Sequence, residues 1–332
     1  MNIIIPMAGI GKRMRPHTLT IPKPLINVAG KPIVQHLIEE ILSFTNNTID
    51  EISFITGNFG STVENNLINI AKSLNLKSKI YYQHEPLGTA HALLCAENSL
   101  SGQVLIAFAD TLIHSEPIVI DNNCDGIIWV QKVKDPSNFG VVLTDENDII
   151  IDFVEKPSTP ISDLAIIGIY YFKDALFLKN EMQYLISNNI SKDGEYQLTD
   201  ALQNMLKKNA KLKIKYVSEW LDCGNKNATL YANKRLLENM AEKNMICPVC
   251  FNNSVIVNPC FIGKNVQICN SVIGPYVSIG NNSIIKNSVV TNSIIQQNTV
   301  ISDGVIDNSI IGNNVKYSGK KNELNIGDYS EI

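Results

Sequence analysis

Residues 1–25, MNIIIPMAGIGKRMRPHTLTIPKPL, decide how the rest of the chain is interpreted. The apolar run from Ile3 to Met7 predicts a buried strand, and the Ala8-Gly9-Ile10-Gly11 segment after it predicts a glycine turn. Backbone N–H groups in such a turn can approach an anion closely. The side chains that add positive charge beside the turn are Lys12, Arg13 and Lys23. We therefore interpret this stretch as a cradle for the phosphates of a nucleotide.

Neither of the two commonest phosphate loops fits this turn. Only Ile10 separates Gly9 from Gly11, whereas a P-loop places four residues between its glycines and then continues Gly-Lys-Ser/Thr. Met14 stands where the dinucleotide fingerprint requires its third glycine. The simpler interpretation is an ordinary strand-to-helix turn. The three cations and the Pro-Lys-Pro-Leu sequence at residues 22–25 favour a phosphate site instead.

Composition excludes several classes of partner. The net charge of −4 over 332 residues lacks the basic footprint of a nucleic-acid-binding protein. No apolar run reaches the ~20 residues of a membrane span, and we expect neither a signal peptide nor a membrane partner. The seven cysteines are an odd number in a long chain, which fits free thiols in a reducing cytoplasm. We therefore expect a cytoplasmic protein.

Hydrophobic periodicity predicts an α/β fold for the first part of the chain. Strand-like and helical patterns alternate, which favours a mostly parallel, doubly wound sheet whose ligands lie at the carboxyl ends of its strands. Beyond about residue 125 the pattern becomes strand-rich and predicts extra, partly antiparallel strands. The predicted helices are residues 32–44, 62–74, 89–99, 195–208 and 225–243. The predicted strands are residues 51–56, 79–83, 103–108, 127–133, 140–143, 149–154 and 166–172.

A different repeat begins after about residue 245. Aliphatic residues recur in six-residue steps, and glycines follow several of them. Such hexapeptide periodicity indicates a β-helix in which each coil buries its aliphatic side chains on the next. The repeating positions are Ile256, Ile262, Ile268, Ile273, Ile279, Ile285, Ile295 and Ile301.

The motifs together resemble a known family. Gly-x-Gly-x-Arg-Met-x-Pro at residues 9–16, followed by Pro-Lys-Pro-Leu at residues 22–25, resembles the sugar-phosphate nucleotidyltransferases. These NDP-sugar pyrophosphorylases join an NTP to a sugar 1-phosphate, and the resemblance is closest to bacterial glucose-1-phosphate thymidylyltransferases. It implies a Rossmann-like, doubly wound mixed sheet over residues 1–245 and a left-handed parallel β-helix over residues 246–332. Many members carry Thr where this chain has Lys12, which adds charge near the phosphates.

The resemblance assigns roles at the reacting centre. It implies that Arg13 contacts the triphosphate and that Lys23 contacts the phosphates where reaction occurs. Asp110 ends an apolar strand and Asp222 lies in Trp-Leu-Asp-Cys-Gly, and both resemble the family's ligands of Mg²⁺, which prefers hard oxygens. A lone Asp after a strand is more often a turn residue. The residues expected to contact the phosphates through the turn are Ala8, Gly9, Gly11 and Lys12.

The resemblance also implies two recognition regions. Gln83, Gly88 and Thr89 match the family's Gln-x-x-Pro-x-Gly-x-Ala pattern, because a Gln amide can pair with a pyrimidine edge and Gly88 leaves room for the base. A turn with a helix cap is the alternative. The residues that resemble a sugar pocket are Gly140, Glu155, Lys156 and Tyr170. An adjacent Glu-Lys is also common as a solvated pair.

Several alternatives stay open. The expected substrates are dTTP or UTP with a sugar 1-phosphate, and dTTP with glucose 1-phosphate is the favoured pair. A second, acyltransferase activity of the β-helix is disfavoured, because such enzymes generally use a histidine base and all five histidines precede residue 115. A non-catalytic regulatory or assembly protein of the same fold is the other possibility. We expect a homo-oligomer. Free thiols are preferred over a zinc site formed by Cys247, Cys250, Cys260 and Cys269.

Overall fold

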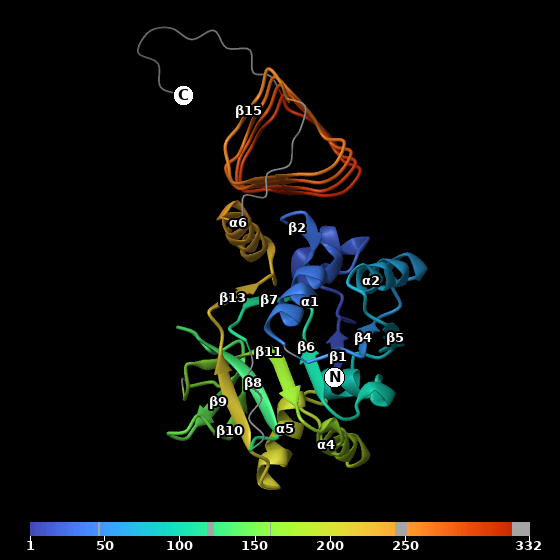
Figure 1. Cartoon of the computed structure of the whole chain (residues 1–332), viewed down its shortest axis with the longest axis vertical. Helices are drawn as coiled ribbons and strands as arrows, with labels where there is room; N and C mark the ends of the chain where they lie inside the picture. Colours follow the sequence, from blue (N-terminus) through green and yellow to red (C-terminus); the bar gives the residue numbers. More distant parts are fainter. Residues whose placement is uncertain (46, 118–122, 160, 243–250, 321–332) are drawn as a thin grey trace. The chain divides into compact units, whose positions relative to one another are not determined.

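Strand β1 (Asn2–Pro6) lies inside the main sheet because its isoleucines leave no face for solvent. A computed structural model describes residues 1–45, 47–117, 123–159, 161–242 and 251–320 (Figure 1). Ile3, Ile4 and Ile5 are all fully buried in it. Successive side chains of a strand point to opposite faces, so both faces of the sheet are covered here, as is typical of parallel strands in α/β proteins.

The main sheet has nine strands in a mixed arrangement. β1 pairs in parallel with β4 and β6, and β4 pairs in parallel with β5. β11 then pairs antiparallel with β6, β8 and β9, which joins this parallel part to the remaining strands. The bounds are β4 (Glu51–Thr56), β5 (Ser78–Tyr82), β6 (Val104–Ala107), β8 (Gly126–Lys132), β9 (Gly140–Thr144), β10 (Ile150–Glu155), β11 (Leu164–Phe172) and β12 (Leu212–Tyr216). The Rossmann-like mixed sheet expected from the sequence is confirmed.

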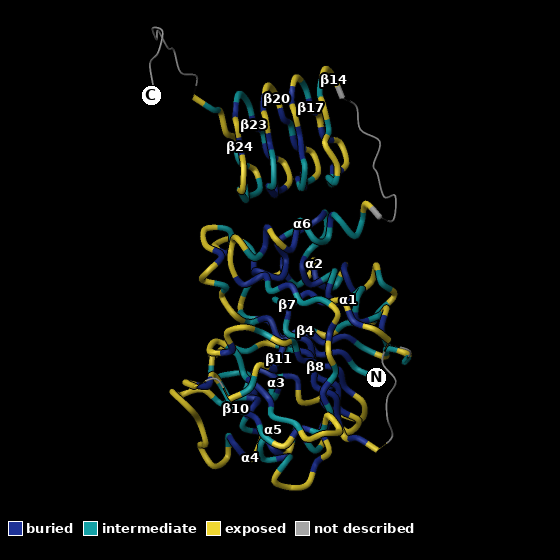
Figure 2. Tube along the Cα trace, turned by 90° about the vertical axis from the view of Figure 1, so that its left-hand side faces the viewer, coloured by how far each residue is buried: buried dark blue, intermediate teal, exposed yellow. Residues whose placement is uncertain are grey.

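Amphipathic helices bury their apolar faces in this unit. A single cluster of buried side chains joins Ile4 of β1 and Ile55 of β4 to residues of α3, α4 and α5. Figure 2 shows the strands β4, β8 and β11 as mostly buried tube. The bounds are α1 (Ile33–Phe44), α2 (Ser61–Ser73), α3 (Thr89–Leu94), α4 (Ala175–Ser187) and α5 (Leu198–Lys207), with short 3₁₀ turns η1 (Lys12–Met14), η2 (His17–Leu19), η3 (Lys23–Leu25) and η4 (Glu97–Ser99).

Two sequence predictions of helices need correction. The helix expected at residues 195–208 begins only at Leu198, because Tyr196 is held in an extended segment by backbone hydrogen bonds to Leu87 and Ala90. The helix expected at residues 89–99 ends at Leu94 and continues only as the 3₁₀ turn η4. Both differences fall where tertiary hydrogen bonds or a chain turn override helical periodicity.

A separate two-stranded sheet was not predicted. β7 (Thr111–His114) pairs antiparallel with β13 (Glu219–Asp222). Each strand has four residues, and they lie about a hundred residues apart in sequence. Short segments of this length carry too little periodicity to be recognised from sequence alone. This pairing of β7 with β13 brings Asp110 and Asp222 together.

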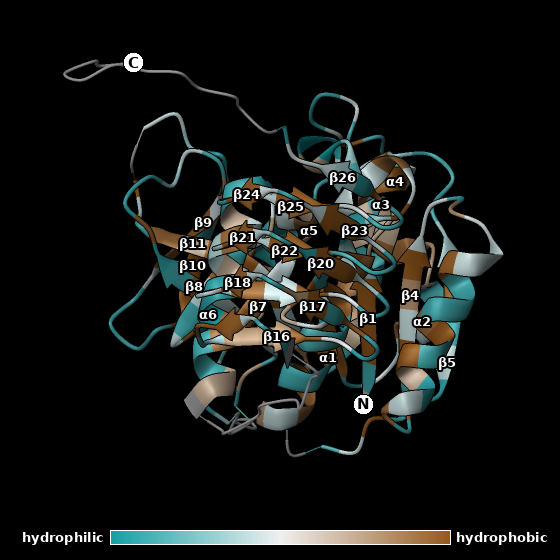
Figure 3. Cartoon of the chain, turned by 90° about the horizontal axis from the view of Figure 1, so that it is seen from above, coloured by the Kyte–Doolittle hydropathy of each residue, from teal (hydrophilic) through white to brown (hydrophobic). Residues whose placement is uncertain are grey.

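The C-terminal part is a three-sided parallel β-helix, which fits the left-handed β-helix expected from the hexapeptide repeat. Its strands stack in parallel into three sheets, as the columns of labelled strands in Figure 3 show. The bounds are β14 (Phe251–Asn252), β15 (Val255–Ile256), β16 (Cys260–Ile262), β17 (Gln267–Cys269), β18 (Val272–Ile273), β19 (Val277–Ile279), β20 (Ile284–Lys286), β21 (Val289–Val290), β22 (Ile294–Ile295), β23 (Val300–Ser302), β24 (Val305–Ile306), β25 (Ile310–Ile311) and β26 (Lys316–Ser318).

The β-helix is held together inside by aliphatic side chains and at its corners by asparagines. All eight predicted repeat positions belong to or pack against one apolar cluster, with Ile279 and Ile285 fully buried. At one corner Asn253 donates to Asn270 at 3.1 Å, and Asn270 donates to Asn287 at 3.2 Å. These asparagines have positive φ, a conformation that Asn tolerates better than most residues.

The β-helix belongs to a larger unit than the repeat itself. Contacts divide the chain into residues 1–26 with 32–224 and residues 27–31 with 225–332. The second unit therefore includes α6 (Lys226–Glu242) and most of a hairpin formed by β2 (Asn27–Val28) and β3 (Lys31–Pro32). Asn233 on α6 accepts from Ala29 N and from Ser278 Oγ. The domain boundary expected at residue 245 lies outside the described residues.

Two further expectations concern membranes and cysteines. Within the described ranges, no helix is both long and apolar enough to cross a membrane. Cys124 and Cys223 are buried and form no disulfide with another described residue, and Cys260 and Cys269 are partly exposed. Cys247 and Cys250 lie outside the described residues, so the zinc alternative that needs them stays untested.

Replacing Ile279 by Ala is expected to destabilise the β-helix unit by about 2–5 kcal/mol, because the substitution leaves a cavity between stacked coils. The matched control is Val305→Ala, since Val305 is 84% exposed and its loss creates no cavity. Urea unfolding followed by circular dichroism measures both changes. Equal effects of the two substitutions would contradict the assigned core.

Candidate active site

The predicted glycine turn follows β1 and leads into the 3₁₀ turn η1. Gly11 adopts a left-handed conformation, with φ 65° and ψ 40°. Its carbonyl accepts hydrogen bonds from Met14 N at 3.0 Å and Thr18 Oγ1 at 2.8 Å. A Cβ on Gly11 would lie 3.1 Å from Thr18 Cγ2 and 3.2 Å from Lys23 Cβ. The backbone at Gly11 therefore needs glycine for both its conformation and its close packing.

Gly9 differs from Gly11 because the position that a side chain would occupy is open space. A Cβ there would meet no atom within 4 Å. Gly9 lines a cavity of about 450 Å³ together with Ala8 and Gly11. A cavity of this size suits a small organic ligand. The missing side chain thus leaves backbone exposed to whatever enters the cavity.

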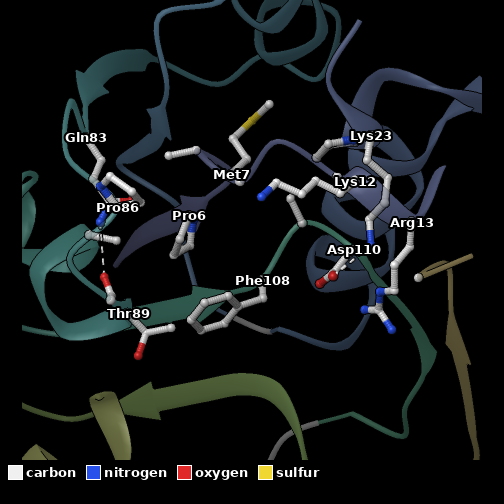
Figure 4. A pocket seen from close by; sticks show the side chains of 18 of the residues that line it. Pro6, Met7, Lys12, Arg13, Lys23, Gln83, Pro86, Thr89, Phe108 and Asp110 are labelled. Atoms are coloured by element: carbon white, nitrogen blue, oxygen red, sulfur yellow. Dashed lines mark hydrogen bonds and ion pairs between the residues drawn. The ribbon is translucent and has the colours of Figure 1, made fainter. Parts of the chain in front are cut away.

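The first cavity has a charged end and a less charged end. In Figure 4, Arg13, Lys23 and Asp110 lie together on one side of the cavity, and Gln83 and Thr89 lie on the other. Lys12 extends between them into the cavity (Figure 4). Such a lining suits a molecule with an anionic group at one end and a hydrogen-bonding ring at the other.

The less charged end is braced by a distant segment of the chain. Gly88 has φ 101°, and a Cβ there would lie 2.5 Å from the carbonyl oxygen of Tyr196. Ala90 N donates to that same oxygen at 2.9 Å, and Leu198 N donates to Thr89 Oγ1 at 2.8 Å. The Gln83 amide donates to Gly88 O at 3.1 Å and lies 3.2 Å from His91 Nδ1. These bonds fix the amide that was expected to read a base.

Strand pairing places the two predicted metal ligands side by side. β7 begins at Thr111, directly after Asp110, and Asp222 pairs with Thr111 in the small sheet. Cys223 N donates to the Asp110 carbonyl at 3.1 Å. Burial raises the pKa of Asp222, and the nearby charge of Asp110 raises it further. The two carboxylates are therefore close enough to repel each other.

Two cations, Lys23 and Arg13, offset the negative charge of these carboxylates. Lys23 Nζ lies 2.8 Å from Asp110 Oδ2, and its side chain is only 9% exposed. The charges of Lys23 and Arg13 lower the pKa of Asp222 against the effect of burial. A Cβ on Gly224 would lie 2.8 Å from Asp222 Oδ2 and 3.2 Å from Arg13 Nη2, so glycine allows both groups to approach here.

The donor set at this point fits a magnesium ion. Mg²⁺ prefers hard oxygen ligands and is usually held by one or two carboxylates together with phosphate oxygens and water. Asp110 and Asp222 supply two adjacent carboxylates, and burial together with the charge of Asp110 raises the pKa of Asp222, a cost that a divalent cation would relieve. In the described part of the chain, no cluster of three or more His, Cys, Asp or Glu forms a metal site.

A second cavity of about 510 Å³ adjoins the first. The residues that line both cavities are Arg13, Thr89, Phe108 and Asp110. Glu155 lines the second cavity and accepts a hydrogen bond from Thr199 Oγ1 at 3.3 Å. Burial raises the pKa of Tyr170, and the charge of Glu155 raises it further, so this phenol stays protonated and can donate.

A β-bulge shapes the wall of the second cavity. The register of β11 against β8 shifts between Ile166 and Tyr170, and Gly168 has φ 83°. Two carbonyls of this segment bond residues on either side of Asp110: Gly168 O accepts from Phe108 N at 2.9 Å, and Ile167 O accepts from Thr111 Oγ1 at 3.0 Å. Bulges commonly re-aim side chains beside active sites. Here the bulge ties the second cavity to the carboxylate pair.

Most predicted site residues meet in these two cavities. The first cavity contains Ala8, Gly9, Gly11, Lys12, Arg13, Lys23, Gln83, Gly88, Thr89 and Asp110. The second adds Gly140, Glu155, Tyr170 and Asp222. Lys156 is not among the lining residues of either cavity. Its side chain is 63% exposed, and its Nζ lies 3.9 Å from Glu155 Oε1.

Several lining residues were missed. Gln197, Leu198 and Thr199 line the second cavity but were interpreted only as part of a helix. Phe108 and Trp220 also line it, and the Trp220 indole nitrogen is buried without a partner among the described residues. The available signal was position, because Phe108 and Trp220 each lie two residues before a predicted metal ligand.

The chain is similar in sequence to several known proteins. The chain is 34% identical to the bifunctional protein GlmU of Methanocaldococcus jannaschii over 238 residues, which are 72% of this chain but only 55% of that protein. It is 28% identical to the glucose-1-phosphate thymidylyltransferase of Streptomyces antibioticus over 305 residues, 85% of this chain and 83% of that protein. The chain thus spans about half the length of the GlmU proteins it matches.

A solved structure and a family model complete the comparison. The crystal structure of a UDP-glucose pyrophosphorylase complexed with UDP-glucose matches with a TM-score of 0.59 and 25% identity, covering 72% of this chain and 98% of that one. The family model described as nucleotidyl transferase matches residues 2–239. With the glycine turn, the carboxylate pair and the mixed sheet all inside that range, the chain belongs to the nucleotidyl transferase family.

Proposed function

We propose that this protein is a sugar-1-phosphate nucleotidyltransferase that converts an NTP and a sugar 1-phosphate into an NDP-sugar and pyrophosphate. The observation that carries the proposal is the pair of adjoining cavities that share Arg13 and Asp110. One cavity suits a nucleotide and the other suits a phosphorylated sugar. Their junction is where a phosphate oxygen of one substrate would meet the α-phosphorus of the other.

The reaction asks the protein mainly for positioning and charge neutralisation. An oxygen of the sugar 1-phosphate forms a bond to the α-phosphorus, and the bond from that phosphorus to the bridging oxygen of the β-phosphate breaks, so that pyrophosphate leaves with its electron pair. Both substrates are anionic, and the cations around the junction reduce their repulsion. Holding the two phosphates in line contributes further, because it converts a bimolecular encounter into a local step.

Each side of the first cavity has a part in this scheme. The backbone at Gly9 and Gly11, with Lys12 and Arg13, binds the triphosphate. Gln83 and the Gly88 backbone orient the base, as the family pattern implies. Asp110 and Asp222 would hold Mg²⁺, which would supply neutralisation of phosphate charge.

The second cavity recognises the sugar. Glu155 accepts hydrogen bonds from sugar hydroxyls, and the Thr199 hydroxyl holds its carboxylate in place at 3.3 Å. The protonated Tyr170 phenol donates a hydrogen bond to a sugar oxygen. Gly140 leaves room beside Glu155, since a Cβ there would lie 3.0 Å from Glu155 Oε2. We keep Lys156 as a ligand of the sugar phosphate, which requires its exposed side chain to turn inward.

The favoured substrates are dTTP and glucose 1-phosphate, with UTP as the alternative nucleotide. The thymidylyltransferase relative supports dTTP, because its match extends through both parts of this chain. The GlmU relatives match a smaller share of this chain, 72% against 85% for the thymidylyltransferase. The neighbouring UDP-glucose complex supports UTP. For the β-helix we propose assembly or regulation, since all five histidines lie in the first unit and none is available to it as a base.

A pyrophosphate-release screen tests the proposed function. Purified protein with Mg²⁺ is assayed against each NTP crossed with a panel of sugar 1-phosphates. Release that requires both a pyrimidine NTP and a sugar 1-phosphate supports the proposal, and the preferred NTP decides between dTTP and UTP. Absence of release with every pair would refute it.

Asp110→Asn is expected to lower turnover at least about 100-fold, because it removes charge from the centre where phosphate charge develops. Asp145→Asn is the matched control, since Asp145 is an exposed carboxylate that lines neither cavity. Initial rates at saturating substrates and Mg²⁺ measure the effect. Near-normal turnover of Asp110→Asn would remove Asp110 from the reacting centre.

Gly9→Ala and Gly11→Ala are expected to fail in different ways. The new methyl of Gly9→Ala enters the cavity without touching protein, so KM for the NTP rises while the melting temperature is unchanged. Gly11→Ala strains a positive φ and crowds Thr18, so it destabilises the fold by about 1 kcal/mol or more. Thermal unfolding and KM measured on both variants separate the two effects. A lowered melting temperature in Gly9→Ala would contradict the open space assigned to it.

Glu155→Gln is expected to raise KM for the sugar 1-phosphate about 10-fold, because hydrogen bonds to a charged acceptor are stronger than those to a neutral one. KM for the NTP should change little, since Glu155 lines only the second cavity. Steady-state kinetics with each substrate varied in turn provides the measurement. An equal rise in both KM values would place Glu155 outside the sugar site.

A further inference from the structure

Lys23 is an unusual cation because it is buried beside a predicted metal ligand. Its Nζ lies 2.8 Å from Asp110 Oδ2, and its side chain is 9% exposed. Asp110 is more open, with 43% of its side chain exposed. The ammonium therefore occupies one side of the carboxylate that the proposed function assigns to Mg²⁺. Figure 4 shows the two side chains joined in this way at the charged end of the cavity.

The backbone fixes the stem of Lys23 more firmly than that of an ordinary lysine. Pro22 and Pro24 restrict the chain on both sides, and Lys23 O accepts a hydrogen bond from Ile26 N at 3.0 Å. Its Cβ packs near Gly11, where a methyl group would lie 3.2 Å away. Only the end of the side chain is left to exchange partners. Such an exchange needs a short movement of the ammonium and no movement of the backbone.

The local charges show why Asp110 needs a counter-cation. Asp222 lies beside Asp110, and two adjacent carboxylates repel each other in a partly buried site. The cations whose charges act on the Asp222 carboxyl are Lys23 and Arg13. An unpaired buried charge is costly, so the buried ammonium of Lys23 needs a replacement anion if Asp110 leaves it. Binding of a metal to Asp110 must therefore be matched by a new anion for Lys23.

We propose that Lys23 is a resident counter-cation that neutralises Asp110 until a metal and a nucleotide arrive together. The Asp110 carboxylate then becomes a ligand of the metal. The Lys23 ammonium that it releases binds a phosphate of the nucleotide. This inference rests on the proposed function, because it uses the carboxylate pair as the metal site. It assigns Lys23 a positioning role before any chemistry occurs.

The exchange couples the binding of metal and nucleotide. A metal alone must compete with the ammonium and leaves it without an anion. A metal with a nucleotide supplies both the cation for Asp110 and the phosphate for Lys23. Linkage requires the coupling to be reciprocal, so nucleotide binding strengthens metal binding by the same factor as the reverse. Removing the ammonium should therefore strengthen binding of the metal alone and weaken the coupling.

Titration of Mn²⁺ into substrate-free protein tests this prediction, with Mn²⁺ as the probe for an oxygen-ligand divalent site. Calorimetry on Lys23→Met is expected to show about tenfold tighter Mn²⁺ binding than on the unchanged protein, within the range of typical coupling effects. Lys12→Met is the matched control, because it removes a cation that lines the same cavity without an ion pair to Asp110. Its affinity for Mn²⁺ alone should stay near that of the unchanged protein.

Two further titrations complete the cycle. Adding whichever of dTTP or UTP supports pyrophosphate release should tighten Mn²⁺ binding strongly in the unchanged protein and much less in Lys23→Met. The double variant Lys23→Met with Asp110→Asn should lose the gain in Mn²⁺ affinity, because the Asp110 carboxylate that would bind the metal has been removed. Lys23→Gln replaces Lys23→Met if the melting temperature shows that the latter does not fold.

The outcomes separate this inference from the proposed function. Unchanged or weaker Mn²⁺ binding in folded Lys23→Met, while the unchanged protein binds Mn²⁺ with nucleotide, would overturn the counter-cation role alone. An equal gain in Mn²⁺ affinity in Lys12→Met would also overturn it. The gain would then come from removing any positive charge near the site and not from the ion pair of Lys23 with Asp110. Absence of Mn²⁺ binding in the unchanged protein, even with nucleotide, would remove the carboxylate metal site and this inference with it.

Discussion

The antiparallel pairing of β7 with β13 is the constraint on which the site depends. It sets two carboxylates from distant parts of the chain side by side, because Asp110 immediately precedes β7 and Asp222 ends β13. Like charges at short range in a partly buried site are unfavourable, and burial together with the charge of Asp110 raises the pKa of Asp222. The ion pair between Lys23 Nζ and Asp110 Oδ2 offsets part of this repulsion. The same ion pair reduces the cost of burying the Lys23 ammonium.

The mixed sheet explains why two cavities meet at this pair. Ligands of parallel α/β sheets bind beyond the carboxyl ends of the strands, and β1 and β6 deliver the glycine turn and Asp110 to that edge. β11 runs in the opposite direction next to β6 and is interrupted by the bulge around Gly168. Carbonyls of the same segment, those of Ile167 and Gly168, bond residues on either side of Asp110. The parallel strands thus supply the glycine turn and Asp110 to the first cavity, and the antiparallel strands supply much of the wall of the second cavity.

The sequence predicted those parts of the structure that are local in character. The glycine turn, the strand before Asp110 and the repeat from Ile256 to Ile301 depend on short-range patterns, and the structure confirms these elements. It did not predict β7 or β13, whose pairing depends on a contact between distant segments. Tyr196 stays extended because Leu87 and Ala90 bond its backbone, which no helical periodicity can reveal. For the same reason, Gln197 and Thr199 were missed as lining residues.

The order of the chain makes the β-helix unit more than a C-terminal addition. Residues 27–31 belong to that unit, although only Ile26 separates them from the Pro-Lys-Pro-Leu motif. Within the unit, Gln296 donates to Asn27 O at 2.9 Å, and a Cβ on Gly30 would lie 2.3 Å from Phe261 Cζ. The hairpin is thus built against coils of the β-helix, while Lys23 lies only four residues before its start. The coils of this unit therefore pack in part on a segment from the start of the chain, and the repeat alone does not account for all of the contacts within the unit.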